Sequence, residues 1–182
     1  MLTPLAVAAL ALLAERPMHP YEMYQLMLHR RDDRLVKVRP GSLYHTIDRL
    51  ARAGLADVVG TEREGNRPER TTYRVSAAGR DALRERLIGM LSSRAGEYPE
   101  FPLALSQAHH LPAQDATALL ATRIDGLRAS LAELDSGVEH VTSLSIAEKY
   151  WIDVDYQRAM LHAELAWLEQ LLERIASGRL DW

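Results

Sequence analysis

The sequence predicts a mainly α fold, in which a winged helix-turn-helix of three helices and a β-hairpin wing precedes a long-helix dimerisation domain. Three observations support this prediction. Hydrophobic residues recur at helical spacing in three stretches before residue 54, two strand-like stretches flank a turn after it, and heptad patterns fill the second half. We therefore expect a winged helix-turn-helix domain over 1–91, a linker with a short helix over 92–112 and an antiparallel helical domain over 113–182.

Three helices are expected in the first part of the chain. The first covers residues 5–14, after a threonine–proline pair that fits an N-cap and first helical position. A breaker with two prolines separates it from a second helix at 20–29. The third covers residues 42–53, with Ser42 as a possible N-cap and Gly54 as a natural C′ residue.

The third helix has one apolar and one polar face. Leu43, Ile47 and Leu50 recur at i, i+4 and i+7, which predicts a buried stripe. The residues on the opposite side are His45, Asp48, Arg49 and Arg52, with Ser42 and Thr46 on its flank. Such a helix can offer hydrogen-bond donors to DNA, although the pattern alone also fits a plain solvated surface helix.

The segment after Gly54 predicts a β-hairpin with a basic tip. Residues 55–59 and 72–75 are strand-like, and a turn with glycine and proline lies between them. The arginines on or beside this tip, which could reach phosphates or a minor groove, are Arg63, Arg67 and Arg70. Ser76 is expected to cap a fourth helix at 77–91. These parts compose a winged helix-turn-helix, whose third helix enters the major groove.

Charge is distributed unevenly along the chain. The net charge of −3 by itself argues against a nucleic-acid partner. Residues 1–90, however, contain 15 Lys and Arg against 11 Asp and Glu, whereas residues 91–182 contain 7 against 14. Because phosphate binding depends on local positive charge, the first half is the candidate nucleic-acid face. Random surface asymmetry is the alternative explanation.

Several other classes of protein are disfavoured. The chain has no cysteine and contains no HExxH, phosphate-binding glycine loop or GxSxG motif, so we expect neither enzymatic activity nor a cofactor. A metal site built from His140, His162 and nearby carboxylates, and a winged protein-interaction module, are the alternatives. The apolar stretch 5–14 is shorter than the roughly 20 residues that span a bilayer, so we expect a soluble, cytoplasmic protein with no membrane partner.

Three motifs resemble the PadR family of bacterial transcriptional regulators. AERPMHPYE at residues 14–22 resembles the family's "aerPmHGYE"; PGSLY at 40–44, with residues 50–55, resembles "GslYptLkrLeeeGL"; and YRVSAAG at 73–79 resembles "YriTeaG". One departure is Pro20, where the family usually carries glycine. The resemblance implies a dimeric winged-helix repressor that binds DNA.

The candidate DNA-binding residues come from the third helix, its entry and the wing. Arg49 is the first candidate for base readout, with His45 and Thr46 beside it. The resemblance places Ser42 and Tyr44 near the DNA backbone, although the helical angle of Tyr44 fits core packing equally well. The complete set is Arg39, Gly41, Ser42, Tyr44, His45, Thr46, Arg49, Arg52, Arg63, Arg67 and Arg70.

Two heptad patterns predict a helical hairpin and a dimer. The first runs from Leu120 to Val141 and the second from Trp151 to Ile175, with Arg158 as the polar exception. The second helix carries a further stripe, which is Met160, Ala163, Trp167 and Leu171. Two stripes need two partners, so we expect a homodimer; a monomeric three-sided core is the alternative. The expected dimerisation residues are Leu161, Leu165, Trp167, Leu168, Leu171 and Leu172.

An effector site is the last expectation. Residues 100–106, 111–112 and 163–168 resemble the helical C-terminal domain of the longer PadR-like proteins, which dimerises and can respond to a small molecule. Aromatic and imidazole side chains that suit a flat phenolic ligand are Tyr98, Phe101, His109, His110, Tyr150 and Trp151. Ordinary packing is the alternative. The expected partners are thus double-stranded DNA with a roughly palindromic operator, a second copy, and a small aromatic effector that releases the repressor.

Overall fold

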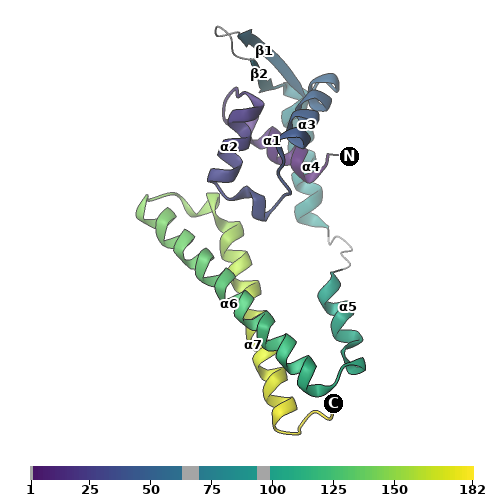
Figure 1. Ribbon diagram of the computed structural model, residues 1–182. Coiled ribbons are helices and arrows are strands. Elements are labelled where there is room, and N and C mark those ends of the chain that lie inside the picture. The colour runs from purple at the N-terminus through teal and green to yellow at the C-terminus, as the bar shows by residue number, and fades with distance from the viewer. Residues whose placement is uncertain (1, 63–69, 94–98) are drawn as a thin grey trace. The chain divides into compact units, whose positions relative to one another are not determined.

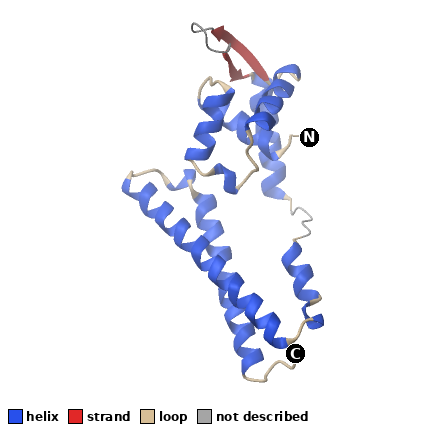
Figure 2. Ribbon diagram, viewed as in Figure 1, coloured by secondary structure: helices blue, strands red, loops and turns tan. Residues whose placement is uncertain are grey.

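The computed structural model describes residues 2–62, 70–93 and 99–182, and the chain forms two compact units, residues 1–96 and 97–182 (Figure 1). The N-terminal unit contains helices α1 to α4 and a two-stranded hairpin, and the C-terminal unit contains helices α5 to α7 (Figure 2). The predicted fold class, a winged helix-turn-helix followed by long helices, is confirmed. Within the described part of the chain, no helix is both long and apolar enough to cross a bilayer.

Helix α1 spans Pro4–Glu15 and is the central helix of the N-terminal unit. The Thr3 hydroxyl accepts a hydrogen bond from the Ala6 amide at 3.3 Å, and Pro4 takes the first helical position, where no N–H donor is needed. The helix is apolar on nearly every side, and α3, α4 and β2 pack around it. The apolar stretch near the start of the chain is therefore a buried helix.

Helix α2 spans Pro20–His29 and begins with a histidine cap. The His19 Nδ1 atom accepts a hydrogen bond from the Tyr21 amide at 3.0 Å, so the neutral ring carries its proton on Nε2. A short 3-10 turn, Asp32–Arg34, follows, and the chain enters it through Arg31, whose φ of 61° lies in the left-handed region. This turn was not predicted from the sequence.

Helix α3 spans Pro40–Arg52 and begins two residues earlier than predicted. Pro40 is at the first helical position, where its fixed φ favours helix, and Arg39 is the extended N-cap. Ser42 therefore lies inside the first turn and is not the N-cap. At the other end Gly54 has a φ of 71°, which confirms the predicted glycine stop.

The hairpin consists of β1, Ala56–Glu62, and β2, Arg70–Val75, paired antiparallel. Both strands are longer than predicted, and a bulge between Val58 and Gly60 shifts their register. Tyr73 also pairs with Met18, each amide donating to the other's carbonyl at 2.9–3.0 Å. This isolated bridge ties the start of α2 to the strand that leads out of the wing.

A compact joint fixes the base of the wing to α4, which spans Ala77–Ser92. The Ser76 hydroxyl accepts from the Gly79 amide at 3.0 Å and donates to the Gly54 carbonyl at 2.7 Å, while the Ser76 amide donates to the Leu55 carbonyl at 3.1 Å. A Cβ atom on Gly79 would lie 2.0 Å from the Leu55 carbonyl oxygen. Only glycine allows this approach, which explains the glycine of the 73–79 motif.

The core of the N-terminal unit brings the three predicted helices together. Methionines and leucines fill it, and their flexible side chains adapt to the irregular space between short helices. The largest fully buried side chains of this unit are Leu10, Leu13, Met18, Met23, Met27, Leu43 and Ile47. All three residues of the predicted α3 stripe are buried, which confirms that α3 presents its polar face outward.

The C-terminal unit is built on an antiparallel pair of long helices. Helix α6 spans Ala113–Ser143 and α7 spans Ile152–Ala176, and they pack along much of their length (Figure 1). Helix α5, Glu100–Ser106, and two 3-10 turns, Ala108–His110 and Glu148–Tyr150, complete the unit. The predicted helical hairpin is therefore present.

Ion pairs fix the register of this hairpin. The Arg123 Nε atom donates to Glu164 at 2.8 Å, and the guanidinium of Arg158, the polar exception in the second heptad pattern, donates to Asp135 at 2.7 Å. Arg123 also lies 3.5 Å from the ring centroid of Phe101, so one guanidinium joins α5, α6 and α7. The core of the unit contains Leu120, Ile124, Leu165, Leu168 and Leu171.

Candidate nucleic-acid interface

Helix α3 presents its polar side between two flanks. At 100° per residue, Gly41, His45 and Arg52 project nearly opposite the buried stripe. On one flank is an open hollow of about 760 Å³, which the side chains of Pro20, Arg39, Gly41, Ser42, Tyr44, His45, Asp48 and Tyr73 line. On the other flank a groove runs between α1, α3 and α4, and Arg49 is one of the residues that line it.

The three base-readout candidates differ in exposure. His45 and Arg49 are exposed, whereas Thr46 is 95% buried, with only 5% of its surface accessible. Thr46 is one position from the buried stripe, and its side chain faces α1 and α4 rather than solvent. Its prediction as a base-reading residue is therefore not supported by its position, while His45 and Arg49 lie where the sequence placed them.

Tyr44 both packs and remains accessible. Its ring meets the His19 ring edge to face, with centroids 6.0 Å apart, and 44% of its surface is exposed. Packing, one of the two interpretations left open by the sequence, thus applies in part, and contact of Tyr44 with the DNA backbone stays a prediction. Tyr44 closes one side of the hollow, and its edge stays available to a ligand that lies along α3.

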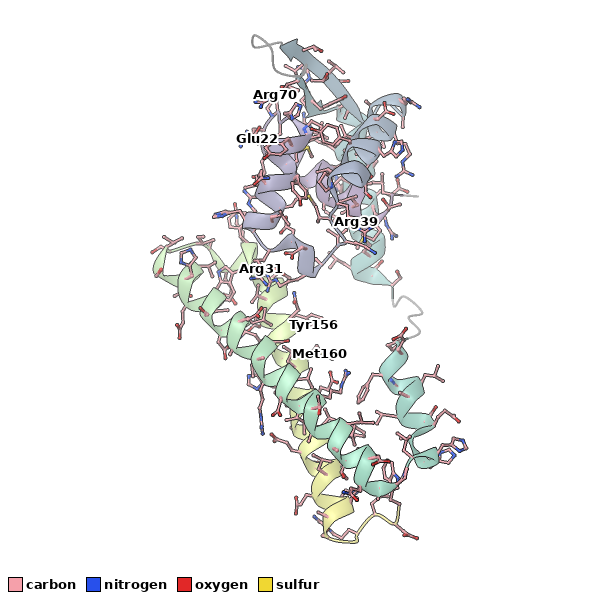
Figure 3. The ribbon with its side chains drawn as sticks, in the orientation of Figure 1. Glu22, Arg31, Arg39, Arg70, Tyr156 and Met160 are labelled. Carbon is pink, nitrogen blue, oxygen red and sulfur yellow. The ribbon has the colours of Figure 1, made fainter. Side chains whose placement is uncertain are left out.

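His19 lies in a basic environment at the start of α2. Partial burial, followed by the positive charge of Arg70, lowers the pKa of His19 below its usual 6.5, and Glu22 opposes this shift. Arg70 on the hairpin and Glu22 on α2 are drawn in Figure 3. Arg70 therefore contributes its charge over the start of α2, next to the hollow.

Tyr73 completes the wall of the hollow. Burial, and then the negative charge of Asp48, raises the pKa of Tyr73 above its usual 10.0. The phenol thus stays protonated near neutral pH and can donate a hydrogen bond. From the sequence, Tyr73 was predicted only as part of a strand and a motif. The alternation of polar and apolar residues in β2 is the sequence signal that one face of this strand is covered.

Three further candidates among the described residues, Arg39, Arg52 and Arg70, form what we call the rim of the α3 surface. Arg39 precedes α3, Arg70 begins β2, and the Arg52 guanidinium donates to Asp48 one turn earlier at 2.8 Å. Arg63 and Arg67 lie outside the described residues. The described rim therefore carries positive charge at the entry to α3, at its end and on the hairpin.

The effector candidates do not form one pocket within the C-terminal unit. Phe101 packs on Arg123, and His109 and His110 stand with ring centroids 4.2 Å apart near the start of α6. Tyr150, 71% exposed, and Trp151 follow the far end of α6, whose 31 residues span about 46 Å. Tyr98 lies outside the described residues. The proposed aromatic cluster is thus divided between the two ends of this helix.

The dimerisation candidates are divided as well. Leu165, Leu168 and Leu171 are buried in the core of their own unit, and Leu161 and Leu172 are partly buried there. Trp167 is 47% exposed. Leu171 of the predicted second stripe thus lies in the core of the helical hairpin. Met160 and Trp167 of that stripe are exposed, and Ile152 and Tyr156 are exposed on the same face of α7. Among the described residues, no three His, Asp or Glu side chains gather as metal ligands.

A three-helix core, a hairpin wing and an outward polar third helix define a winged helix-turn-helix of the DNA-binding class. Residues 9–85 match the model of the Transcriptional regulator PadR-like family. The N-terminal unit is thus a PadR-like domain, and the resemblance found in the sequence motifs is confirmed. The match covers 77 of the 182 residues, and this part of the chain is similar to PadR-like transcriptional regulators.

Solved structures with the same fold cover nearly the whole chain. PadR of Bacillus subtilis in complex with operator DNA matches with a TM-score of 0.75 at 21% identity, and the match covers 94% of this chain and 98% of the PadR chain. The same protein in complex with p-coumaric acid has a TM-score of 0.73 at 16% identity, with coverage of 97% and 99%. A PadR-like regulator of Bacillus cereus has a TM-score of 0.69 at 15% identity, with coverage of 96% and 99%. None of the curated proteins matches the chain.

Proposed function

We propose that the protein is a homodimeric repressor that binds a roughly palindromic operator through α3 and the wing and leaves it when a small aromatic effector binds. The observation that carries the proposal is the outward polar face of α3, with exposed His45 and Arg49 above a fully buried stripe. A major groove about 12 Å wide admits one such helix. In a twofold dimer, two copies of α3 would read half-sites about 34 Å apart.

The start of α3 is suited to a phosphate. The backbone N–H groups of the first turn, around Gly41 and Ser42, have no partner within the helix and carry the positive end of its dipole. Among the described residues, Gly41 has no neighbour within 4 Å of the place where a Cβ would lie, so packing against these residues does not require glycine there. A close approach of the DNA backbone is the reason we propose for this glycine.

Base readout is assigned to Arg49 and His45, and phosphate contacts to Arg39, Arg52 and Arg70. Arginine pairs with guanine through two hydrogen bonds, and one such pair contributes about 1–3 kcal/mol of discrimination. Phosphate contacts contribute affinity that falls with salt but does not depend on sequence. Arg63 and Arg67 would extend the second group.

A selection of bound fragments from the source genome tests the operator and the role of Arg49. The wild-type chain should retain a small set of related, roughly palindromic fragments at physiological salt. Arg49→Ala should relax the preference at one base of each half-site, while Arg84→Ala, which removes an exposed arginine from α4, should leave the preference unchanged. An unchanged motif in Arg49→Ala would overturn its role, and no retained fragment would overturn operator binding.

The exposed stripe of α7 supports the homodimer. Ile152, Tyr156, Met160 and Trp167 are each about half exposed or more, and they share one face of the helix. Sedimentation at micromolar concentration should show a dimer. Trp167→Glu should shift it toward monomer, and His162→Glu, an exposed change on another side of α7, should not. A monomeric wild-type chain would contradict the proposal.

Effector release is proposed by comparison with the Bacillus subtilis regulator that was crystallised with p-coumaric acid. For this chain we propose a planar phenolic carboxylate as the ligand class. Titration of the protein–operator complex with p-coumarate and related phenols should release DNA with at least one of them. If none of these compounds changes DNA affinity or the melting temperature, effector control by this class is excluded.

A further inference from the structure

Asp48 is the acidic residue among the side chains that line the hollow beside α3. It lies on the polar side of the helix, about 60° from His45 and 40° from Arg52 at 100° per residue. Its side chain is 46% exposed, and its Oδ2 atom accepts the 2.8 Å hydrogen bond from the Arg52 guanidinium. A carboxylate thus projects from the flank of the polar side that borders the hollow, next to the residues with which the proposed function places DNA in contact.

A stabilising role for the helix is a weak explanation of this carboxylate. An exposed ion pair between residues i and i+4 contributes little to helix stability, and the order here, acid before base, is the ordinary favourable one. Against DNA the same carboxylate is costly, because the phosphates repel it. An acid at this position is therefore unfavourable to binding unless it meets a hydrogen-bond donor on the DNA.

The major groove presents two kinds of donor, the 4-amino group of cytosine and the 6-amino group of adenine. A carboxylate has only acceptors, so it pairs with the cytosine amino group without needing a donor of its own, whereas adenine is best read by an amide, which also donates to N7. At the same position, guanine and thymine present acceptor atoms that would repel the carboxylate. Selection would thus come from both attraction and repulsion.

We propose that Asp48 is a specificity-determining residue of α3 that accepts a hydrogen bond from the 4-amino group of a cytosine in each half-site. Through the same carboxylate it orients Arg52, whose other N–H groups stay available for a guanine edge or a phosphate. This inference rests on the proposed binding of α3 in the major groove. Asp48 would be a second residue that recognises a base edge, with a negative charge and a preference for cytosine, whereas Arg49 is positive and prefers guanine.

The test is a selection from randomised DNA with the full-length wild-type chain and the Asp48→Asn, Asp48→Ala and Asp57→Asn variants. Asp57 is a matched control, because it is an equally exposed acid paired with an arginine, Arg74, but it lies on β1. The wild-type chain and Asp57→Asn should both select cytosine at one position of each half-site by about tenfold or more. Asp48→Ala should lose this preference, and Asp48→Asn, which keeps the shape of the side chain, should shift it toward adenine.

The outcomes separate this inference from the proposed function. If the wild-type chain selects no DNA motif, the proposed function fails and the role of Asp48 fails with it. If the wild-type chain selects a motif and both Asp48 variants select the same one, only the role of Asp48 is overturned. A uniform rise in affinity, equal in Asp48→Asn and Asp57→Asn with no change in base preference, would also overturn it, because it would show a charge effect alone.

Discussion

Replacing Gly79 by alanine tests how α4 is held against the base of the wing. At an unconstrained helical position this change favours folding by about 1 kcal/mol, because glycine is the poorer helix former. Here the new Cβ would lie 2.0 Å from the Leu55 carbonyl oxygen and 2.9 Å from Val75 Cγ2. The obstacle is backbone, which cannot rotate away, so α4 must shift by more than 1 Å from the hairpin.

The expected loss of stability follows from the contacts that Gly79 and Ser76 make at the base of the wing. Overpacking at such a site costs about 1–3 kcal/mol, and a shift of α4 also weakens the Ser76 cap, which contributes about 1 kcal/mol. After the helical gain is subtracted, Gly79→Ala should destabilise the N-terminal unit by about 1–3 kcal/mol. Gly89, which lies on the same helix, is the control, because a Cβ there would meet no described atom within 4 Å. Gly89→Ala should stabilise the N-terminal unit by about 0.5–1 kcal/mol.

Urea unfolding of the full chain measures both effects. All three tryptophans, Trp151, Trp167 and Trp182, lie in the C-terminal unit, so their fluorescence follows that unit, whereas circular dichroism follows the helices of both. Gly79→Ala should move the dichroism transition to lower urea and leave the fluorescence transition in place. If Gly79→Ala proves as stable as Gly89→Ala, the close contact with Leu55 is not present in solution.

Three further predictions concern single contacts. The Arg30 guanidinium donates two hydrogen bonds to Glu15 and lowers the pKa of its carboxyl group. Glu15→Gln should therefore lower the free energy of unfolding by roughly 0.5 kcal/mol near neutral pH. This difference from the wild type should vanish as the pH falls below 4.5. The pKa of His19 in the folded chain lies below 6.5, so the unfolded chain binds more protons and the stability should fall as the pH drops from 6.5. His19→Asn keeps a capping oxygen and should reduce the difference in melting temperature between pH 5 and pH 7.5. If the variant shows the same difference as the wild type, another group causes the pH dependence. Arg123→Lys keeps the charge but not the planar stack on Phe101, so it should destabilise the C-terminal unit by about 1 kcal/mol in fluorescence-monitored unfolding, and a variant equal to wild type would show that the stack contributes nothing.

Local sequence signals predicted the parts of the DNA-binding unit well. The Thr3 cap, the glycine stop at Gly54 and the Ser76 cap each depend on residues within a few positions, and all three are present. The start of α3 was misplaced because two signals competed. Pro40 at the first helical position outweighed Ser42 as an N-cap, so the helix begins two residues earlier, about half a turn.

Features that depend on distant neighbours were harder to predict. Thr46 is polar and was assigned to the exposed flank of α3, but α1 packs on α3 there, and Thr46 is buried in the groove between α1, α3 and α4. Periodicity assigned Leu171 to the second, outward stripe of α7, but Leu171 is buried in the core between α6 and α7. In both cases the helical angle was right, and the width of the covered face, which is set by the neighbouring helices, was underestimated.

The same limit applies to the aromatic cluster. Phe101 and Trp151 were grouped by chemistry, but the length of α6 places them at its opposite ends within the C-terminal unit. Chemical type predicted which side chains suit a phenolic ligand. It carried no information on which of them lie close together.

The dependence of DNA affinity on salt concentration tests the central claim most directly. The affinity of the full chain for its selected operator should fall steeply between 50 and 200 mM salt, and Arg39→Ala and Arg70→Ala should each reduce the slope of log affinity against log salt by about one. Both residues lie on the rim described above. Binding with no salt dependence, or slopes unchanged in both variants, would contradict the assignment of α3 and the wing as the DNA-binding face.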